Sequence, residues 1–170
     1  MTTTPAPKKS DICSPVIFNL PDFLKGICDR AQYIRWLQRK AVEHVKRDRE
    51  RFGPDNCTIS IYKKMIHEAV STGGDRDYYT GLPLDWKLIS TFDNDSAKAG
   101  RSDYLRTFGN LPTVDHARDA DGKLRFVICS WRVNDAKSHL TEDEFCELCE
   151  QFLTHRKNKK SEFRSPGASQ

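Results

Sequence analysis

The sequence lacks any long run of apolar residues, and this absence argues against a membrane-spanning helix. Its first residues, MTTTPAPKKSD, contain no apolar core, so they do not have the character of a secretory signal. Methionine is scarce, with 2 residues in a chain of 170, and no internal repeat is visible. We therefore expect a cytoplasmic protein with no membrane partner, built as one domain with frayed ends.

Paired zinc-binding motifs are also lacking, although the chain has six cysteines. Cys146 and Cys149 have the CxxC spacing, but no second pair is present to complete a tetrahedral site. Both lie in a stretch with helical periodicity, where Cys149 falls on the expected core stripe. We therefore interpret these cysteines as reduced thiols, with Cys149 in the core. A regulatory protein with a redox-active pair at these two positions stays an alternative.

Positive charge is segregated along the chain, although the net charge is only +4. Between Arg30 and Arg51 there are eight lysines and arginines against three acids, and a second basic cluster, HRKNKKSEFR, lies near the C-terminus. Such clusters suit a polyanion, because neutralised phosphates release condensed counterions. A solvated helix face and a basic tail would give the same pattern. The candidate nucleic-acid contacts are Arg35, Arg39, Lys40, Lys46 and Arg47, with Arg118 from a later loop.

Two helices are predicted in the first half of the chain. The first is capped by Asp29 and ends at Gly53, which precedes a proline. The second is capped by Thr58 and ends at the segment STGG. Apolar residues recur in both helices with helical spacing. The residues expected to face the core are Tyr33, Leu37, Ala41, His44 and Val45 in the first helix and Ile61, Met65, Ile66, Ala69 and Val70 in the second.

The second half of the chain changes its hydrophobic period. The segment YYTG predicts a short strand, a turn and another extended piece, and residues 92–104 have the composition of a polar loop. A strand ending near His116, a loop, a second strand and a short helix from about Val133 are expected next. The last helix has a capping box from Thr141 to Glu144. Its expected buried stripe is Phe145, Leu148, Cys149, Phe152 and Leu153.

Asp115 and Asn134 are candidate ligands for a metal ion. In a strand–loop–strand–helix unit, a side chain near the end of the first strand can face one at the start of the helix. Both residues offer oxygen, which suits a hard cation such as Mg²⁺ or Mn²⁺. Asp135 competes with Asn134, but helical geometry turns it about 100° away. His116 alternates to the other side of the strand, and an imidazole can accept a proton from water near neutral pH.

The order VDH, strand and then NDAKS resembles the HNH, or ββα-metal (His-Me finger), nuclease superfamily. It is closest in pattern to the HNH domain of RNA-guided CRISPR nucleases and to phage junction resolvases, and YYTG and TEDEF match common flanking features. The resemblance covers roughly residues 77–155 and leaves the long basic helix unassigned. It implies that His116 is the general base. It also implies that Asp115 and Asn134 hold one magnesium ion and that Lys137 lies near the phosphate.

The sequence departs from this family at two points. Many members have a further histidine as a metal ligand later in the helix, whereas His139 follows Asn134 by only five residues and is expected at the surface. Many members also have four zinc-binding cysteines, of which only Cys129 is present. Asp77 and Arg132 stand where cysteines would be expected. We therefore expect no structural zinc and a core held together by packing.

We therefore expect an α+β fold, with N-terminal helices packed on a small β hairpin and a ββα-metal finger, followed by a C-terminal helix. Residues 1–15 and 158–170 are expected to be disordered, and residues 16–157 to form one globular domain, helical over 16–74 and ββα-like over 75–157. The implied function is metal-dependent hydrolysis of phosphodiester bonds in DNA, double-stranded DNA being favoured. A catalytically inactive nucleic-acid-binding module on the same scaffold is the alternative. Cleavage of both strands with one site per chain would favour a homodimer.

Overall fold

The computed structural model describes the chain in four stretches, which are residues 17–53, 58–91, 100–118 and 123–163. The N-terminal segment expected to be disordered lies outside the described residues. Most of the predicted polar loop at 92–104 and of the loop between the two predicted strands also lies outside them, as does the end of the basic C-terminal cluster.

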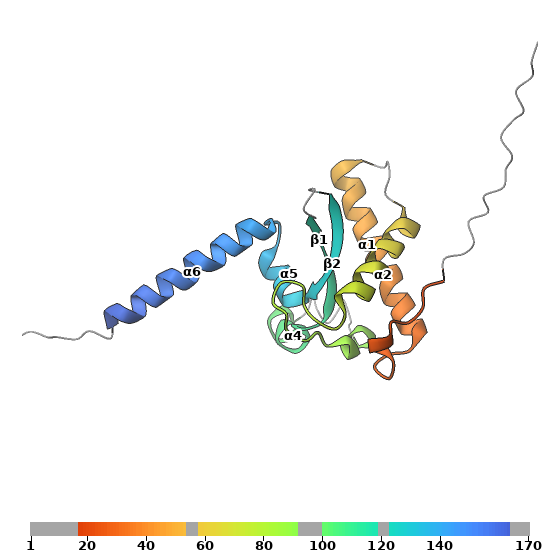
Figure 1. The fold of residues 1–170 in the computed structure, drawn as a ribbon, viewed down its shortest axis with the longest axis horizontal. Coiled ribbons are helices and arrows are strands. Elements are labelled where there is room, and N and C mark those ends of the chain that lie inside the picture. Colours follow the sequence, from red (N-terminus) through yellow and green to blue (C-terminus); the bar gives the residue numbers. More distant parts are fainter. Residues whose placement is uncertain (1–16, 54–57, 92–99, 119–122, 164–170) are drawn as a thin grey trace, which may run out of the picture.

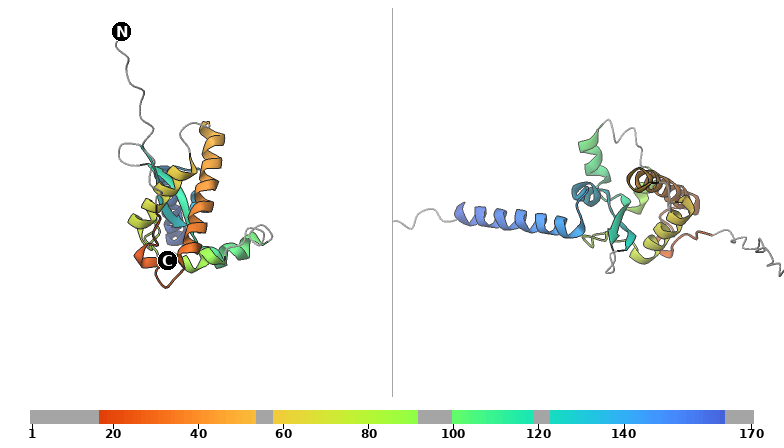
Figure 2. Two further views of the ribbon diagram at one scale, coloured as in Figure 1. Left: turned by 90° about the vertical axis from the view of Figure 1, so that its right-hand side faces the viewer. Right: turned by 90° about the horizontal axis from the view of Figure 1, so that it is seen from above.

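The described elements form an α+β fold in which an antiparallel two-stranded sheet lies between helices (Figure 1 and Figure 2). Two long helices cover one face of the sheet, and a short helix covers the other. The predicted arrangement of N-terminal helices, hairpin-plus-helix unit and C-terminal helix is confirmed. The main elements are α1 (Arg30–Phe52), α2 (Ile59–Gly73), β1 (Pro112–Arg118), β2 (Leu124–Ser130), α5 (Trp131–Lys137) and α6 (Glu142–Phe163).

The ends of the first two helices follow from local capping. The Asp29 carboxylate accepts a hydrogen bond from the backbone N–H of Gln32 at 2.7 Å, and the Gln32 side chain accepts one from Asp29 N–H at 2.9 Å. These two bonds satisfy backbone donors that have no partner inside the helix. Gly53 ends α1 with a φ of 87°, a conformation that glycine adopts without a steric penalty. The Thr58 hydroxyl caps α2 with a single bond, accepting from the backbone N–H of Ile61 at 3.2 Å. Both predicted caps and the stop at Gly53 are confirmed.

The core lies between α1, α2 and the sheet. All five residues predicted to face inward from α1 are buried, as are Ile66 and Val70 of α2. Trp36 of α1 packs edge-on against Trp86, with ring centroids 5.2 Å apart. The prediction for Ile61 is wrong, because this first-turn residue of α2 is 48% exposed.

Three short segments differ from the sequence-based prediction. The segment around YYTG forms a turn with a single bridge, between Arg76 and Pro83, in place of two extended pieces. The short 3-10 helix η2 (Trp86–Ser90) follows, and α4 (Arg101–Phe108) occupies the described part of the predicted polar loop. Strand β1 continues two residues past His116, and α5 begins at Trp131, two residues before the predicted start. A second 3-10 helix, η1 (Asp22–Leu24), precedes α1.

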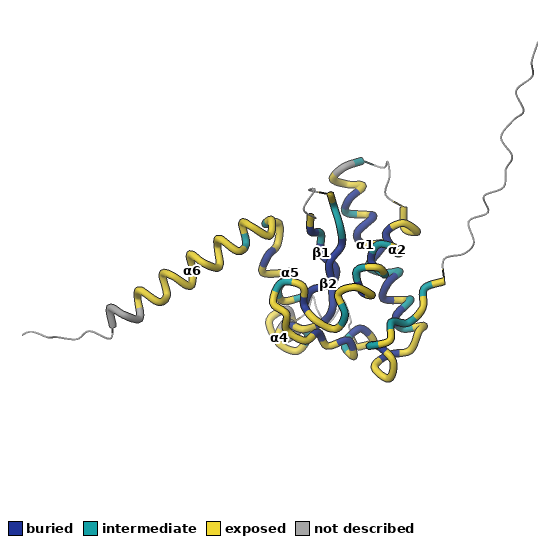
Figure 3. Tube along the Cα trace, viewed as in Figure 1, coloured by how far each residue is buried: buried dark blue, intermediate teal, exposed yellow. Residues whose placement is uncertain are grey.

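Helix α6 runs away from the body of the molecule (Figure 1). Its predicted capping box is confirmed, because Thr141 N–H donates to the Glu144 carboxylate at 2.8 Å and Glu144 N–H donates to the Thr141 hydroxyl at 3.2 Å. The predicted buried stripe is wrong over most of its length, since Phe152 is 62% exposed and Cys149 is also exposed, while Phe145 is half-buried. Most of the described part of α6 is exposed (Figure 3). The stripe has the period of a core-facing helix, but the helix extends beyond the elements that could cover it. Helix α6 also continues to Phe163, into the segment predicted as a disordered tail.

Candidate functional site

Strand β1 presents two neighbouring candidate residues to opposite layers of the fold. Asp115 pairs with Val127 of β2, and His116 pairs with Phe126. Successive side chains on a strand point to opposite faces. The Asp115 side chain therefore contacts α5, whereas the His116 side chain contacts α1.

On the α5 side, Asp115 is part of a buried polar cluster. Its Oδ2 accepts a hydrogen bond from the Tyr79 hydroxyl at 2.8 Å and lies 3.0 Å from the Lys137 ammonium. Its Oδ1 accepts a hydrogen bond from the backbone N–H of His116 at 2.8 Å. Asp115 is 8% exposed and Lys137 is 5% exposed. Burial of this carboxylate is tolerable because a positive charge and two hydrogen-bond donors surround it.

Asp77 holds Tyr79 in position. One carboxylate oxygen of Asp77 accepts hydrogen bonds from the backbone N–H groups of Tyr79 and Thr80, both at 2.9 Å. The other oxygen accepts from the N–H of Ser130, at the end of β2, at 2.6 Å. Asp77 thus ties the turn to the sheet through hydrogen bonds, at a position where the resemblance would place a zinc-binding cysteine. Burial, with a further contribution from Asp115, raises the pKa of Tyr79, so its hydroxyl stays a hydrogen-bond donor at neutral pH.

On the opposite face, His116 lies against Asp48 of α1. The His116 Nε2 lies 3.0 Å from Asp48 Oδ2, so the carboxylate charge acts directly on the imidazole. The same Asp48 oxygen accepts a hydrogen bond from the Tyr62 hydroxyl at 2.8 Å. The His116 ring also packs on Phe126 and His44, each at a centroid distance of 4.9 Å. Burial lowers the pKa of His116, and the nearby Asp48 charge opposes this shift.

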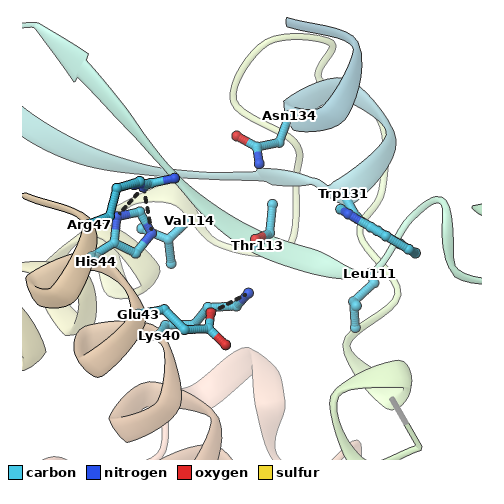
Figure 4. A pocket seen from close by; sticks show the side chains of 9 residues that line it. All are labelled: Lys40, Glu43, His44, Arg47, Leu111, Thr113, Val114, Trp131 and Asn134. Atoms are coloured by element: carbon cyan, nitrogen blue, oxygen red, sulfur yellow. Dashed lines mark hydrogen bonds and ion pairs between the residues drawn. The ribbon is translucent and has the colours of Figure 1, made fainter. Parts of the chain in front are cut away.

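A cavity of about 220 Å³ lies between α1, the start of β1 and α5 (Figure 4). Two of its lining residues, Lys40 and Arg47, carry positive charge, and one, Glu43, carries negative charge. Figure 4 shows the Asn134 amide turned toward Thr113 on the wall formed by α5 and β1. The full lining is Lys40, Glu43, His44, Arg47, Leu111, Thr113, Val114, Trp131 and Asn134.

Burial and neighbouring charges shift the pKa values of two side chains in this cavity, His44 and Lys40. The Arg47 guanidinium donates a hydrogen bond to His44 Nδ1 at 2.6 Å. Burial, followed by the Arg47 charge, lowers the pKa of His44 to about 2, so the imidazole is neutral and accepts this bond. Burial also lowers the pKa of Lys40, which is partly offset by Glu43 at 3.4 Å. The cavity is thus lined by a neutral histidine, the Arg47 guanidinium and the Lys40–Glu43 ion pair, which leaves a net positive charge.

The structure brings together only part of the predicted site. Asp115 and Lys137 are in contact, while His116 lies on the other face of the strand. Asn134 lines the cavity beside two predicted nucleic-acid contacts, Lys40 and Arg47. Among the described residues, no hydrogen bond joins the Asn134 side chain to Asp115. Of the other predicted contacts, Arg39 is half-buried and Arg35, Lys46 and Arg118 are exposed.

Several neighbours of the site were missed by the sequence analysis. Asp48 and His44 were assigned no role in chemistry, although they lie four residues apart and therefore share one face of α1. Tyr79 was considered only as part of the flanking motif YYTG, and Asp77 only as a residue standing where a zinc-binding cysteine would be expected. A polar residue on the core-facing side of an amphipathic helix, as His44 is, was the one signal that could have indicated a buried partner.

Asp115 offers carboxylate oxygens and Asn134 an amide oxygen, which are the kinds of donor that a hard divalent cation accepts. Water and phosphate commonly complete the shell of Mg²⁺. The Lys137 ammonium already places a positive charge 3.0 Å from the carboxylate. The described residues contain no group of three or more His, Cys, Asp or Glu that could hold a metal. One carboxylate and one amide, the pair of ligands predicted from the sequence, do not make up such a group.

Comparison of the chain with protein-family models, with curated proteins and with solved structures finds no match. Within the part of the chain that the structure describes, every helix is too short or too polar to cross a bilayer.

Proposed function

We propose that this protein is a metal-dependent endonuclease of the HNH type that hydrolyses phosphodiester bonds in DNA, with double-stranded DNA favoured. The observation that carries the proposal is the contact between Asp115 of β1 and Lys137 of α5, at 3.0 Å. It packs the strand with the Asp-His pair against the helix with the Asn-x-x-Lys spacing. This is the ββα order that the resemblance implies.

Each residue has a definite role in this proposal. Asp115 and Asn134 would hold one Mg²⁺ or Mn²⁺ ion, which when bound stabilises negative charge on the phosphate. His116 would take the proton of the attacking water, and its lowered pKa keeps it neutral and able to accept a proton at pH 7. Lys137 would balance the charge of the phosphate.

The basic surface of α1 supports a nucleic-acid substrate. Lys40 and Arg47 line the same cavity as Asn134, so a phosphate backbone bound there would lie directly beside α5. Arg35 and Lys46 are exposed on the same helix and would add contacts that do not depend on base sequence. The basic helix, which the resemblance leaves unassigned, thus acquires a role in binding.

A second candidate is a nucleic-acid-binding module on the same scaffold that performs no chemistry. It is favoured by the contacts of Asp115, whose Oδ2 is engaged by both Tyr79 and Lys137 and whose Oδ1 is engaged by a backbone N–H. A divalent ion would compete with these groups for the carboxylate. In this case the basic cavity would bind phosphate, and the buried ion pair would serve only stability.

A cleavage assay separates the two candidates. Supercoiled plasmid is incubated with the full chain in Mg²⁺, in Mn²⁺ or in chelator, and binding to labelled duplex DNA is measured in parallel without divalent ion. We expect nicking or linearisation only with a divalent ion. His116→Gln should abolish this cleavage and retain DNA binding. The matched control is His139→Gln, which changes an exposed histidine and should cleave as the parent does.

The results of this assay distinguish the nuclease from the binding module. Loss of cleavage in His116→Gln, with a thermal melt and DNA affinity close to those of the parent, supports the nuclease. Undiminished cleavage by His116→Gln contradicts it. Binding by the parent chain with no cleavage in either metal assigns the second candidate.

A further inference from the structure

Helix α6 carries an apolar stripe that the described parts of the chain do not cover. Leu148 is 49% exposed, Phe152 is 62% exposed and Leu153 is 50% exposed. At about 100° per residue, Phe145, Leu148, Cys149 and Phe152 share one face of the helix, and Leu153 flanks it. Contiguous exposed apolar surface on a soluble protein commonly marks an interaction site.

The charges of α6 are divided between its two halves. The first half is acidic and the second half is basic, so the helix is complementary to itself when reversed. Helical geometry also places two of the bases, Arg156 and Lys159, on the same face as the apolar stripe, while Glu142 lies at its margin. Up to Lys159, the acids are Glu142, Asp143, Glu144, Glu147 and Glu150, and the bases are His155, Arg156, Lys157 and Lys159; Lys160 and Glu162 follow.

We propose that α6 pairs with α6 of a second copy of this chain in antiparallel orientation, which makes the protein a homodimer. Antiparallel pairing places the acidic half of each helix beside the basic half of the other, and leaves the apolar stripes in contact at the centre. In the register that sets Glu142 opposite Lys159, Phe152 of one copy lies opposite Cys149 of the other at the centre of the pair. Parallel pairing is disfavoured because it would set Arg156 against Arg156 and Lys159 against Lys159.

The shape of the molecule allows this pairing. A helix of 22 residues is about 33 Å long, which provides about three heptads of contact. Because α6 runs away from the body, a second helix can lie along it (Figure 1). The two bodies then lie at opposite ends of the helix pair. The proposal rests on α6 alone and does not depend on nuclease activity.

The proposal is tested by sedimentation velocity of the full chain over a range of concentrations and salt. The parent should show a monomer–dimer equilibrium. Leu148→Glu/Phe152→Glu should be monomeric, because it places charge in the apolar seam. Two charge variants are designed as a complementary pair. One is Arg156→Glu/Lys159→Glu, and the other is Glu142→Lys/Glu144→Gln, in which glutamine retains the capping box.

Each charge variant alone should raise the dissociation constant about tenfold or more. An equimolar mixture of the two should associate again, because opposite charges then face each other. The matched control is Glu147→Lys/Glu150→Lys, which changes acids on the far side of the helix and should dimerise as the parent does. Far-UV circular dichroism and a thermal melt check that each variant is folded.

Three outcomes overturn the proposal. The first is a parent chain that is monomeric at every concentration. The second is a dimer that persists in the folded Leu148→Glu/Phe152→Glu variant, since its interface then lies elsewhere. The third is a mixture of the charge variants that associates no better than either variant alone, which excludes the antiparallel charge pairing.

Discussion

Lys137 and Asp115 form a buried ion pair that joins α5 to β1, with the ammonium 3.0 Å from Oδ2 and both residues less than a tenth exposed. The Tyr79 hydroxyl donates to the same oxygen. A buried ion pair adds little net stability, because the desolvation of its charges offsets their attraction. Removal of one partner is nevertheless strongly destabilising, because it leaves an uncompensated buried charge. The pair therefore fixes how α5 sits on the hairpin and determines the charge at the candidate site.

Removal of the ammonium should destabilise the protein strongly. Lys137→Met leaves a buried carboxylate without its counterion, and we expect the free energy of unfolding to fall by about 3 kcal/mol. Asp115→Asn/Lys137→Met should recover part of this loss, because no uncompensated charge remains. Urea unfolding measures both changes, and Lys87→Met in η2, at an exposed position, is the control. A loss no greater than that of the control would mean that the pair contributes nothing.

Stability should fall as the pH is lowered below about 6.5. The pKa of His44 is about 2 in the folded protein and about 6.5 in the unfolded chain, so between these values the unfolded state binds more protons. The contribution of neutral His44 to the free energy of unfolding is complete above the pKa of the unfolded chain. It declines at lower pH, by about 1 to 2 kcal/mol between pH 6.5 and pH 5. His44→Gln should flatten this decline, whereas His139→Gln should not. Chemical unfolding at a series of pH values measures the slope, and equal slopes in parent and His44→Gln would contradict the assignment.

Asp77 should contribute strongly to the free energy of unfolding, although it lies in a turn. Asp77→Ala leaves three backbone N–H groups without their acceptor, and we expect a loss of about 2 kcal/mol in the free energy of unfolding. Asp75→Ala, which removes an exposed carboxylate two residues earlier, is the control. Hydrogen exchange of the Ser130 amide should also accelerate in Asp77→Ala. An unchanged exchange rate at that amide would contradict the role of Asp77.

Lys40 and Lys46 should contribute phosphate contacts to DNA binding. Lys40→Gln and Lys46→Gln should each weaken binding to duplexes of unrelated sequence by a similar factor, and each should reduce the slope of log affinity against log salt by about 1. Lys64→Gln, on the exposed side of α2, is the control. Fluorescence anisotropy in chelator measures the slope without cleavage. A slope reduced equally by all three substitutions would show that binding is not localised to α1.

If His116 is the general base, the pH profile of cleavage should reflect its surroundings. Burial lowers its pKa, so the acid limb of the rate should lie below the ordinary histidine value of about 6.5. The Asp48 charge raises this pKa, and Asp48→Asn should therefore move the acid limb to still lower pH. The profile is measured as initial rate of plasmid nicking from acid to neutral pH. A limb that stays in place in a folded Asp48→Asn would remove Asp48 as the residue that tunes His116.

Local features of this protein are largely determined by its sequence. The caps at Asp29, Thr58 and Thr141 act within three residues of the chain, so a short motif is enough to predict them. The core face of α1 follows from helical periodicity alone. The order of the hairpin and the helix that follows it was predictable from the change of hydrophobic period along the chain. The α+β class could be inferred from these elements together.

Only the tertiary structure decided what each predicted residue faces. Strand alternation predicts that Asp115 and His116 diverge, but it does not say that Lys137 fills one side and Asp48 the other. The apolar stripe of α6 has the period of a buried helix, and its exposure depends on how far the helix extends from the body. Period is a property of the chain, whereas burial requires a second surface, and that surface is supplied by segments distant in sequence.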